Sequence, residues 1–326
     1  MPRLNRLDQV LFPVKEHPVF AVVKDSAGER HLSIPDKKAI VNVNNNRVLG
    51  VVGRGYRLIT NREALNWAYQ CCASVFPETK PSEWQVERTD APSTAGYCHI
   101  DLCHNSTALD FAFVRAEQRP ETFGPFIRVT NSYNGLRPLS FDIGFYRKIC
   151  RNSMIVPQSV IRFSFNHLQR DVGENIRFEI AHDKLTQVRT GISRYFEILQ
   201  NCKISRVHFD SLVMNALSLK RPEPWNPKSR AGTEWQVLAS ELSKMNDRYA
   251  NDLGENAYAV CNSMTDFASH PPSNRCVYRD RHSFQKLAGV WLAAFTDQCS
   301  KADFSIERYL ENAGSAQNSK TDVFLN

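Results

Sequence analysis

The first half of the chain contains short stretches in which apolar and polar residues alternate, the pattern of a half-buried strand. This alternation predicts strands at 19–23, 31–34, 39–43, 47–52, 97–104, 109–114 and 160–165. Within this half, apolar residues recur at helical spacing over 63–75, where Thr60 or Asn61 is the expected N-cap. Segment 82–92 is polar and ends at Pro92, so we expect a loop or an irregular strand there.

A β-hairpin is predicted within 126–157. Ile127 and Val129 alternate with polar residues, and the alternation resumes at Leu139. Between the two arms, Asn131–Gly135 supplies turn residues, because Asn and Gly tolerate positive φ.

In the second half the apolar residues recur every three or four positions, which indicates amphipathic helices. The predicted helices are 185–199, 209–217, 235–249, 258–267 and 287–295. Three prolines in 220–230 indicate an exposed loop. The chain therefore predicts an α+β fold. Its expected parts are an N-terminal arm at 1–18, an antiparallel sheet domain at 19–180, a helical region at 181–312 and a frayed tail at 313–326.

Composition adds a broad class: 42% of the 326 residues are hydrophobic and 23% are charged, as in ordinary globular proteins. The 41 basic and 34 acidic residues give a net charge of +7, which is compatible with nucleic-acid binding and argues against an acidic mimic of DNA. The chain has nine cysteines, no secretory leader and no apolar run of about 18 to 20 residues. These features indicate a reduced, cytoplasmic protein outside the membrane.

One strand brings together three potential metal ligands. His99, Asp101 and Cys103 would share a face of strand 97–104. Zinc sites usually add a second ligand pair at tight spacing, and the sequence has no matching Cys-x-x-Cys or His pair. We therefore expect a plain strand, and we expect neither a metal nor another cofactor.

The acidic residues do not predict a catalytic set. Those on or beside predicted strands are Asp101, Asp110, Asp142 and Glu179. A nuclease needs several acids converging on a metal, and the Asp…Glu-x-Lys spacing is not evident. Gly53 and Gly55 also lack the rest of a phosphate-binding motif. A protein without enzymatic activity is favoured, and a metal-dependent nuclease is the open alternative.

Basic and aromatic residues interleave around the predicted hairpin, as on surfaces that bind nucleic acid. The candidate binding residues are Arg54, Arg57, Arg128, Tyr133, Arg137, Arg147, Lys148 and Arg151. Cations contact phosphates, and aromatic rings stack on unpaired bases at about 1 to 3 kcal/mol per base. The alternative interpretation is that the aromatic residues are core and the arginines are surface groups with no ligand.

The proline-rich loop suggests a different class, a protein that binds another protein. Its candidate residues are Arg221, Trp225, Lys228 and Arg230. Tryptophan and arginine are enriched at interface hot spots, so this loop fits the binding of a host protein. A surface loop with one partly buried Trp is the plain alternative.

Three segments carry a family resemblance. They are KAIVNVNNNRVLGVVGRGYRLITNREAL at 38–65, RVTNSYNGLRPLSFDIGFYRKICRN at 128–152, and a helical segment at 256–295 that includes AGVWLAAF. In this order they resemble an uncharacterised family of conserved phage and plasmid proteins, known only as a domain of unknown function. Where the family commonly has His-Asp before the turn glycine, this chain has Tyr133-Asn134, which removes an acid-base or metal role for that turn.

The resemblance implies a mobile genetic element, no established enzyme activity, and a relation to single-strand annealing proteins. We therefore expect a phage- or plasmid-encoded protein in the bacterial cytoplasm that binds or anneals single-stranded DNA. The alternative is a non-enzymatic protein that binds and inhibits a host anti-phage defence complex. Whether the chain forms a homo-oligomer, and whether its two halves fold independently, stays open.

Overall fold

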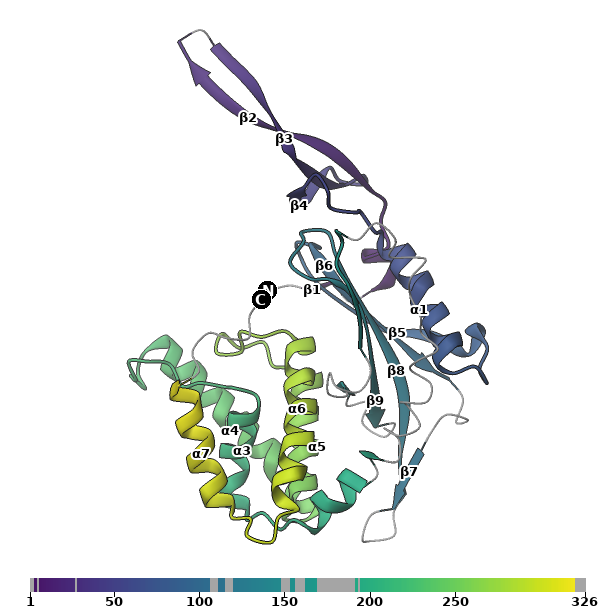
Figure 1. The fold of residues 1–326 in the computed structure, drawn as a ribbon. Coiled ribbons are helices and arrows are strands. Elements are labelled where there is room, and N and C mark those ends of the chain that lie inside the picture. The colour runs from purple at the N-terminus through teal and green to yellow at the C-terminus, as the bar shows by residue number, and fades with distance from the viewer. Residues whose placement is uncertain are drawn as a thin grey trace. The chain divides into compact units, whose positions relative to one another are not determined.

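The computed structural model describes residues 3–4, 6–26, 28–105, 111–114, 120–147, 153–155, 162–168, 191–192 and 194–319. Strands occupy the first half of the chain and helices the second, so the predicted α+β class is confirmed (Figure 1). In this part of the chain, no helix is long and apolar enough to span a bilayer.

The chain forms two compact units that are interleaved in sequence. Unit 1 comprises Met1–Leu109, Pro125–Gly144 and Gln158–Leu185, and unit 2 comprises Asp110–Gly124, Phe145–Pro157 and Thr186–Asn326. This division differs from the predicted boundary near residue 180. Two segments from the strand-rich half belong to the helical unit.

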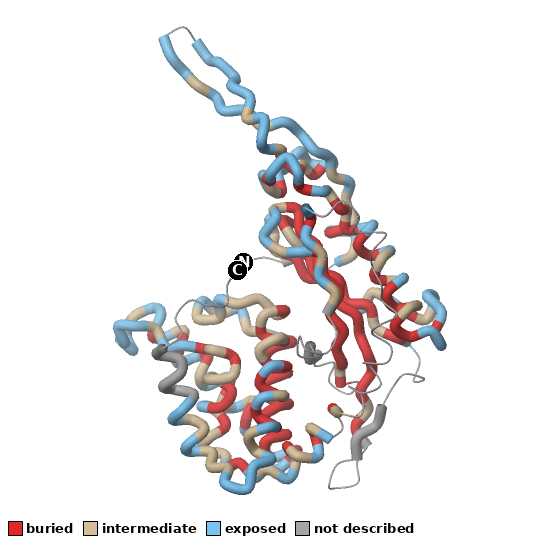
Figure 2. Tube along the Cα trace, in the orientation of Figure 1, coloured by how far each residue is buried: buried red, intermediate tan, exposed pale blue. Residues whose placement is uncertain are grey.

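A three-stranded antiparallel sheet in unit 1 has the order β2-β3-β4. Its strands are β2 (Val14–Asp25), β3 (Gly28–Asn42) and β4 (Arg47–Gly53). Figure 1 shows β2 and β3 continuing as a narrow two-stranded ribbon, and Figure 2 shows that this ribbon is largely exposed.

Two strands, β1 and β2, correct the prediction of an arm at 1–18. β2 already begins at Val14, and β1 (Arg3–Leu4) pairs with β5 (Trp84–Pro92). Pro13 and Pro18 suggested irregular chain, but an edge strand tolerates proline because half of its amide groups need no partner in the sheet.

The second sheet contains eight strands, of which six follow the order β1-β5-β6-β8-β9-β10. Its further strands are β6 (Tyr97–His104), β7 (Phe111–Val114), β8 (Pro120–Ser132), β9 (Leu139–Arg147), β10 (Ser153–Ile155) and β11 (Arg162–Phe165). β6 and β8 are antiparallel, from Tyr97 opposite Ser132 to Cys103 opposite Phe126. The predicted strand 97–104 and the predicted hairpin, now β8–β9, are confirmed, and strand β5 occupies segment 82–92 from Trp84 onward.

Helix α1 (Asn61–Val75) begins where the sequence predicts. Thr60 is its N-cap: the Thr60 hydroxyl accepts a hydrogen bond from the Glu63 amide, and the Glu63 carboxylate accepts one from the Thr60 amide. This reciprocal pair satisfies amides at the helix start. The apolar side of α1 is buried, and the helix packs against β6.

Unit 2 is built around α5 (Ala257–Ser269), which is buried on nearly every side. The other helices are α3 (Phe209–Ala216), α4 (Arg230–Leu253), α6 (Arg281–Cys299) and α7 (Ile306–Ser319), and residues 194–201 are also helical. Side chains of Ser229, Asn256 and Asp280 cap the starts of α4, α5 and α6. The predicted tail at 313–326 is corrected up to residue 319, where α7 ends.

Candidate nucleic-acid interface

The turn of hairpin β8–β9 is fixed in place by buried hydrogen bonds to the start of α1. The Asn131 side-chain amide donates to the Ile59 carbonyl (2.9 Å) and to the Asn61 side-chain oxygen (2.8 Å). The Asn61 backbone amide donates to the Tyr133 hydroxyl (2.9 Å), and the Tyr56 hydroxyl donates to the Ser132 carbonyl (2.6 Å). These neutral partners satisfy one another in the interior, so the turn has one defined position.

Glycine makes the close packing of this turn possible. A Cβ added at Gly50 in β4 would lie 2.5 Å from the Asn134 Cα, and one at Gly96 would lie 2.6 Å from the Asn134 side-chain nitrogen. Gly135 itself has φ of +72°, in the left-handed region. The V-L-G segment of β4 and the Asn-Gly pair of the turn therefore fit each other by shape.

The tyrosines that hold the turn stay protonated. Burial raises the pKa of Tyr56 to about 12, although its hydrogen bond to Ser132 opposes the rise. Burial also raises the pKa of Tyr133. Both phenols are therefore neutral near neutral pH, as their hydrogen bonds to the turn and to α1 require.

Exposed or partly exposed cations lie on β3, on β4 and the loop after it, and next to the turn in the chain. We call this set the turn surface; it consists of Lys37, Arg47, Arg54, Arg57, Tyr97, Leu136 and Arg137. The five cations and Leu136 are exposed or partly exposed, and Lys37 lies opposite Gly53, next to Arg54 in the chain. The Arg137 guanidinium stands 4.5 Å from the centre of the Tyr97 ring. The result is a rigid surface that combines positive charge with a flat, stacked group.

Tyr56 connects the loop after β4 to the turn of hairpin β8–β9. It lies between Arg54 and Arg57 in the chain, and its ring approaches the position of a Cβ at Gly135 to 3.9 Å. Arg47 donates to the Ser93 carbonyl (2.8 Å), which ties β4 to the loop before β6. The loop after β4 and the hairpin turn are thus neighbours in space.

Three of the predicted binding residues are not on this surface. Arg128 is 1% exposed and forms two 2.6 Å hydrogen bonds to Asp101, and Tyr133 is fully buried. Arg147, in unit 2, is buried and donates to Glu121 at 2.6 Å. These three are corrected to interior groups. Lys148 and Arg151 lie outside the described residues.

The strand with three potential ligands uses them for other contacts. Both Asp101 oxygens accept hydrogen bonds from Arg128, and His99 Nδ1 is 2.8 Å from the Thr130 hydroxyl. Burial raises the pKa of the Cys103 thiol, which disfavours the thiolate that metals bind. Within the described ranges, no three His, Cys, Asp or Glu side chains are arranged to hold a metal ion.

Acids gather around Arg128 instead. Burial lowers the pKa of this guanidinium, whereas the carboxylates of Asp101, Asp142 and Asp90 raise it, and the net shift is upward. The cluster therefore holds a permanent positive charge among acids, as a buried structural ion pair does. Asp110 and Glu179, the other predicted strand acids, lie outside the described residues.

Unit 2 contains a second buried charge cluster. Glu121 accepts hydrogen bonds from Arg147 (2.6 Å) and from the Tyr258 hydroxyl (2.5 Å), and Asn262 Oδ1 is 3.3 Å from Arg147. The adjoining cavity, whose walls include Phe123, measures about 20 Å³. That volume holds about one water molecule and no substrate, so the cluster serves to connect strand ends to α5.

The loop 220–230 forms another exposed surface, in unit 2. The Arg221 guanidinium stands 4.9 Å from the centre of the Trp225 ring, and Trp225 is 38% exposed. Tyr278, 59% exposed, donates to the Ser218 carbonyl and lies 5.0 Å from Arg279. We call Arg221, Trp225, Tyr278 and Arg279 the loop surface.

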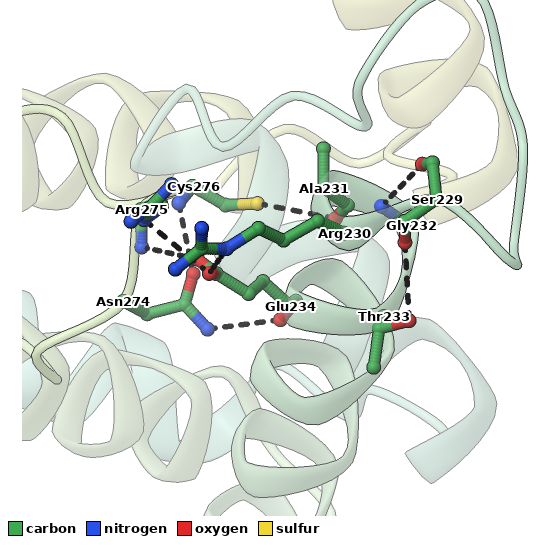
Figure 3. Close-up of polar contacts among 9 residues, drawn as sticks. All are labelled: Ser229, Arg230, Ala231, Gly232, Thr233, Glu234, Asn274, Arg275 and Cys276. Carbon is green, nitrogen blue, oxygen red and sulfur yellow. Dashed lines mark hydrogen bonds and ion pairs between the residues drawn. The ribbon is translucent and has the colours of Figure 1, made fainter.

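The base of this loop is held by the first turn of α4 (Figure 3). Glu234 is 3.6 Å from Arg230 and 3.5 Å from Arg275, and its carboxylate also accepts the Arg275 amide. The Asn274 side chain donates to the Glu234 carbonyl (2.8 Å). Arg230 thus has a partner within the chain although it is exposed, and Lys228 is exposed as well.

Comparison with known proteins identifies a family. The family model described as Domain of unknown function (DUF932) matches residues 108–291, more than half of the chain. The chain belongs to the DUF932 family. No curated protein and no solved structure matches it.

The DUF932 match contains the hairpin β8–β9 and the helices up to the middle of α6. It therefore includes the Asn131–Gly135 turn, the Glu121–Arg147 cluster and the loop surface. Strands β2–β4, with Arg54 and Arg57, precede it. Of the three segments that suggested the family, the one at 128–152 lies inside the match, the one at 256–295 lies mostly inside it, and the one at 38–65 lies outside.

Proposed function

We propose that this DUF932 protein binds single-stranded nucleic acid, and promotes its annealing, through the turn surface. The observation that supports the proposal is the exposed group of Arg54, Arg57 and Arg137 on loops held by buried hydrogen bonds. Cations contact phosphates, and the Arg137 guanidinium over the Tyr97 ring offers a face for an unpaired base.

The family resemblance also supports a proposal about where the protein acts. We place the protein in the cytoplasm of a bacterial host, encoded by a phage or plasmid, where single strands arise during recombination. The proposed role is non-catalytic: binding holds bases exposed for pairing, and no bond is made or broken.

The test is fluorescence anisotropy with labelled single- and double-stranded DNA over a salt series. We expect tighter binding to the single strand and weakening with salt. The variant Arg54→Ala/Arg57→Ala/Arg137→Ala should bind more weakly, and its salt slope should flatten by about 2, because each single-strand phosphate contact contributes about 0.7.

The matched control is Arg6→Ala/Arg248→Ala/Arg308→Ala, which removes the same charge from surface arginines that pair with acids. It should bind as the unmodified protein does. Equal loss in both triple variants would mean that only net charge matters and would overturn the turn surface as the site. An RNA oligonucleotide of the same sequence separates DNA from RNA preference.

The loop surface supports a second candidate function, the binding and inhibition of a host defence protein. Two exposed aromatic rings, each beside an arginine, have the composition of interface hot spots. Trp225→Ala/Tyr278→Ala should abolish recovery of a host protein that the unmodified chain captures and leave DNA anisotropy unchanged. Capture that survives this substitution rules out the loop surface.

A further inference from the structure

The ribbon formed by β2 and β3 lacks a third strand over much of its length. β4 pairs with β3 only from Lys37 to Asn42, whereas β2 and β3 pair as far as Asp25 and Gly28. In the described part of the chain, β2 pairs with no strand other than β3. Its outer edge therefore presents unpaired backbone groups.

The middle of the ribbon exposes large apolar side chains on both faces. Phe20 is 48% exposed, Val22 52% and Leu32 52%. Phe20 and Val22 share one face, and Leu32, opposite Ala21, lies on the other. A two-stranded hairpin is marginally stable alone in water, so this apolar band favours a partner that covers it.

Charges at the two ends of β2 indicate what that partner is. Lys15 and Glu16 lie at one end and Lys24 and Asp25 at the other, with an apolar run between them. If two β2 strands pair antiparallel about Phe20, Lys15 lies opposite Asp25 and Glu16 lies opposite Lys24. Opposite charges at directly paired positions stabilise a sheet.

We propose that the ribbon is a self-association surface, on which β2 of one copy pairs antiparallel with β2 of a second copy, with Phe20 on the two-fold axis. The partner is a second copy of this chain because the strand is complementary to itself in both charge and hydrophobicity. A symmetric interface of this kind closes as a dimer.

The charges within each ribbon are compatible with this pairing. Glu16 already lies 2.7 Å from Lys38, and Asp25 lies 2.5 Å from Arg30. In the dimer each acid gains a second cation from the other copy's β2. Pro18 lacks an amide hydrogen and can donate no hydrogen bond opposite Val22, and the β2–β3 pairing is already irregular between Pro18 and Phe20.

Cysteine crosslinking of the full chain tests the register. Phe20→Cys should form a disulfide-linked dimer on mild oxidation, because position 20 meets itself. His17→Cys should not, since position 17 faces position 23. A mixture of Glu16→Cys and Lys24→Cys should crosslink, and neither should do so alone. The unmodified protein, with its nine cysteines, gives the background.

Sedimentation across the micromolar range tests the association itself. The unmodified chain should be a dimer and Phe20→Asp a monomer, while Val290→Asp, at a comparably exposed site on α6, should stay a dimer. A monomeric unmodified chain overturns the proposal. So does equal crosslinking at positions 17 and 20, or a dimer that Phe20→Asp leaves intact. No nucleic acid is needed, so the result is independent of the turn surface.

Discussion

Hairpin β8–β9 contains arginines of two opposite kinds. Arg137, next to the turn, is partly exposed and stacked on Tyr97, whereas Arg128 and Arg147 are buried, each with a carboxylate at 2.6 Å. The buried ones require an acid partner, because an unpaired interior charge is costly, whereas solvent screens the charge of a partly exposed arginine. A basic cluster in the sequence therefore divides into interior ion pairs and surface groups, and only the surface groups are available to a polyanion.

The largest effect should follow from breaking a buried pair. Arg128→Met leaves Asp101 buried without its partner and should lower the free energy of unfolding by about 3 to 5 kcal/mol. Adding Asp101→Leu should restore most of that loss. Arg54→Met, at an exposed site, should change it by less than about 0.5 kcal/mol. Urea unfolding of the three variants measures the contrast, and similar losses at positions 54 and 128 would refute it.

A smaller loss is expected from disturbing the packing of the turn. In Gly50→Ala the new methyl would meet the Asn134 backbone, and overpacking of this kind should cost about 1 to 3 kcal/mol. Gly53→Ala, three positions further along the chain, meets no atom within 4 Å and is the matched control. If both alanine variants unfold at the same urea concentration, the close fit of β4 to the turn is not needed for stability.

The stacked arginine can be separated from its charge. Arg137→Lys keeps the positive charge but loses the planar group on Tyr97, a contact worth about 0.5 to 1 kcal/mol at exposed sites. Binding of single-stranded DNA should weaken about two- to fivefold, on that same energy scale. Arg54→Lys, without an aromatic neighbour, should bind as the unmodified protein does. Fluorescence anisotropy at fixed salt measures the affinity of both variants for single-stranded DNA. Equal affinities of Arg137→Lys and Arg54→Lys would show that the Arg137–Tyr97 contact has no role in binding.

The smallest expected effect depends on pH. His167 stacks on Tyr56 at 4.5 Å, and its Nδ1 is 3.1 Å from the Arg57 carbonyl. Burial lowers the pKa of His167 from its ordinary 6.5, so protons bind the unfolded chain more tightly. The stability that neutral, buried His167 contributes is fully present above the pKa of this histidine in the unfolded chain. It is lost as the pH falls below that value. Between pH 7 and pH 5 the urea midpoint of unfolding should fall less in His167→Gln than in the unmodified protein. An identical fall in both would exclude His167 as a source of the pH dependence.

Local patterns predicted much of the fold. The alternation in 97–104 gave β6, the Thr60–Glu63 pair gave the start of α1, and the polar break before Tyr258 separated α4 from α5. Each depends on residues within a few positions of one another. β2 was predicted too short because it is exposed on both faces, so its alternation reflects no buried side.

The candidate site was predicted only in part, because burial depends on distant partners. Arg128 meets an acid 27 residues earlier, and Arg147 meets one 26 residues earlier. Neither spacing is visible without the strand register. The anchoring role of Asn61 was also missed: the sequence showed it as a candidate N-cap, and the only signal was the second asparagine, Asn131, in a turn motif 70 residues later.

The interleaving of the two units constrains how the chain can fold during synthesis. Unit 1 needs its last segment, Gln158–Leu185, and unit 2 needs strand segments that are made before most of its helices. Neither unit is therefore a continuous stretch that can complete its core as it leaves the ribosome. A fragment that begins at residue 186 lacks Glu121, Phe123 and Phe145 and leaves part of the surface around Tyr258 uncovered. Cutting the gene once therefore does not separate the two units.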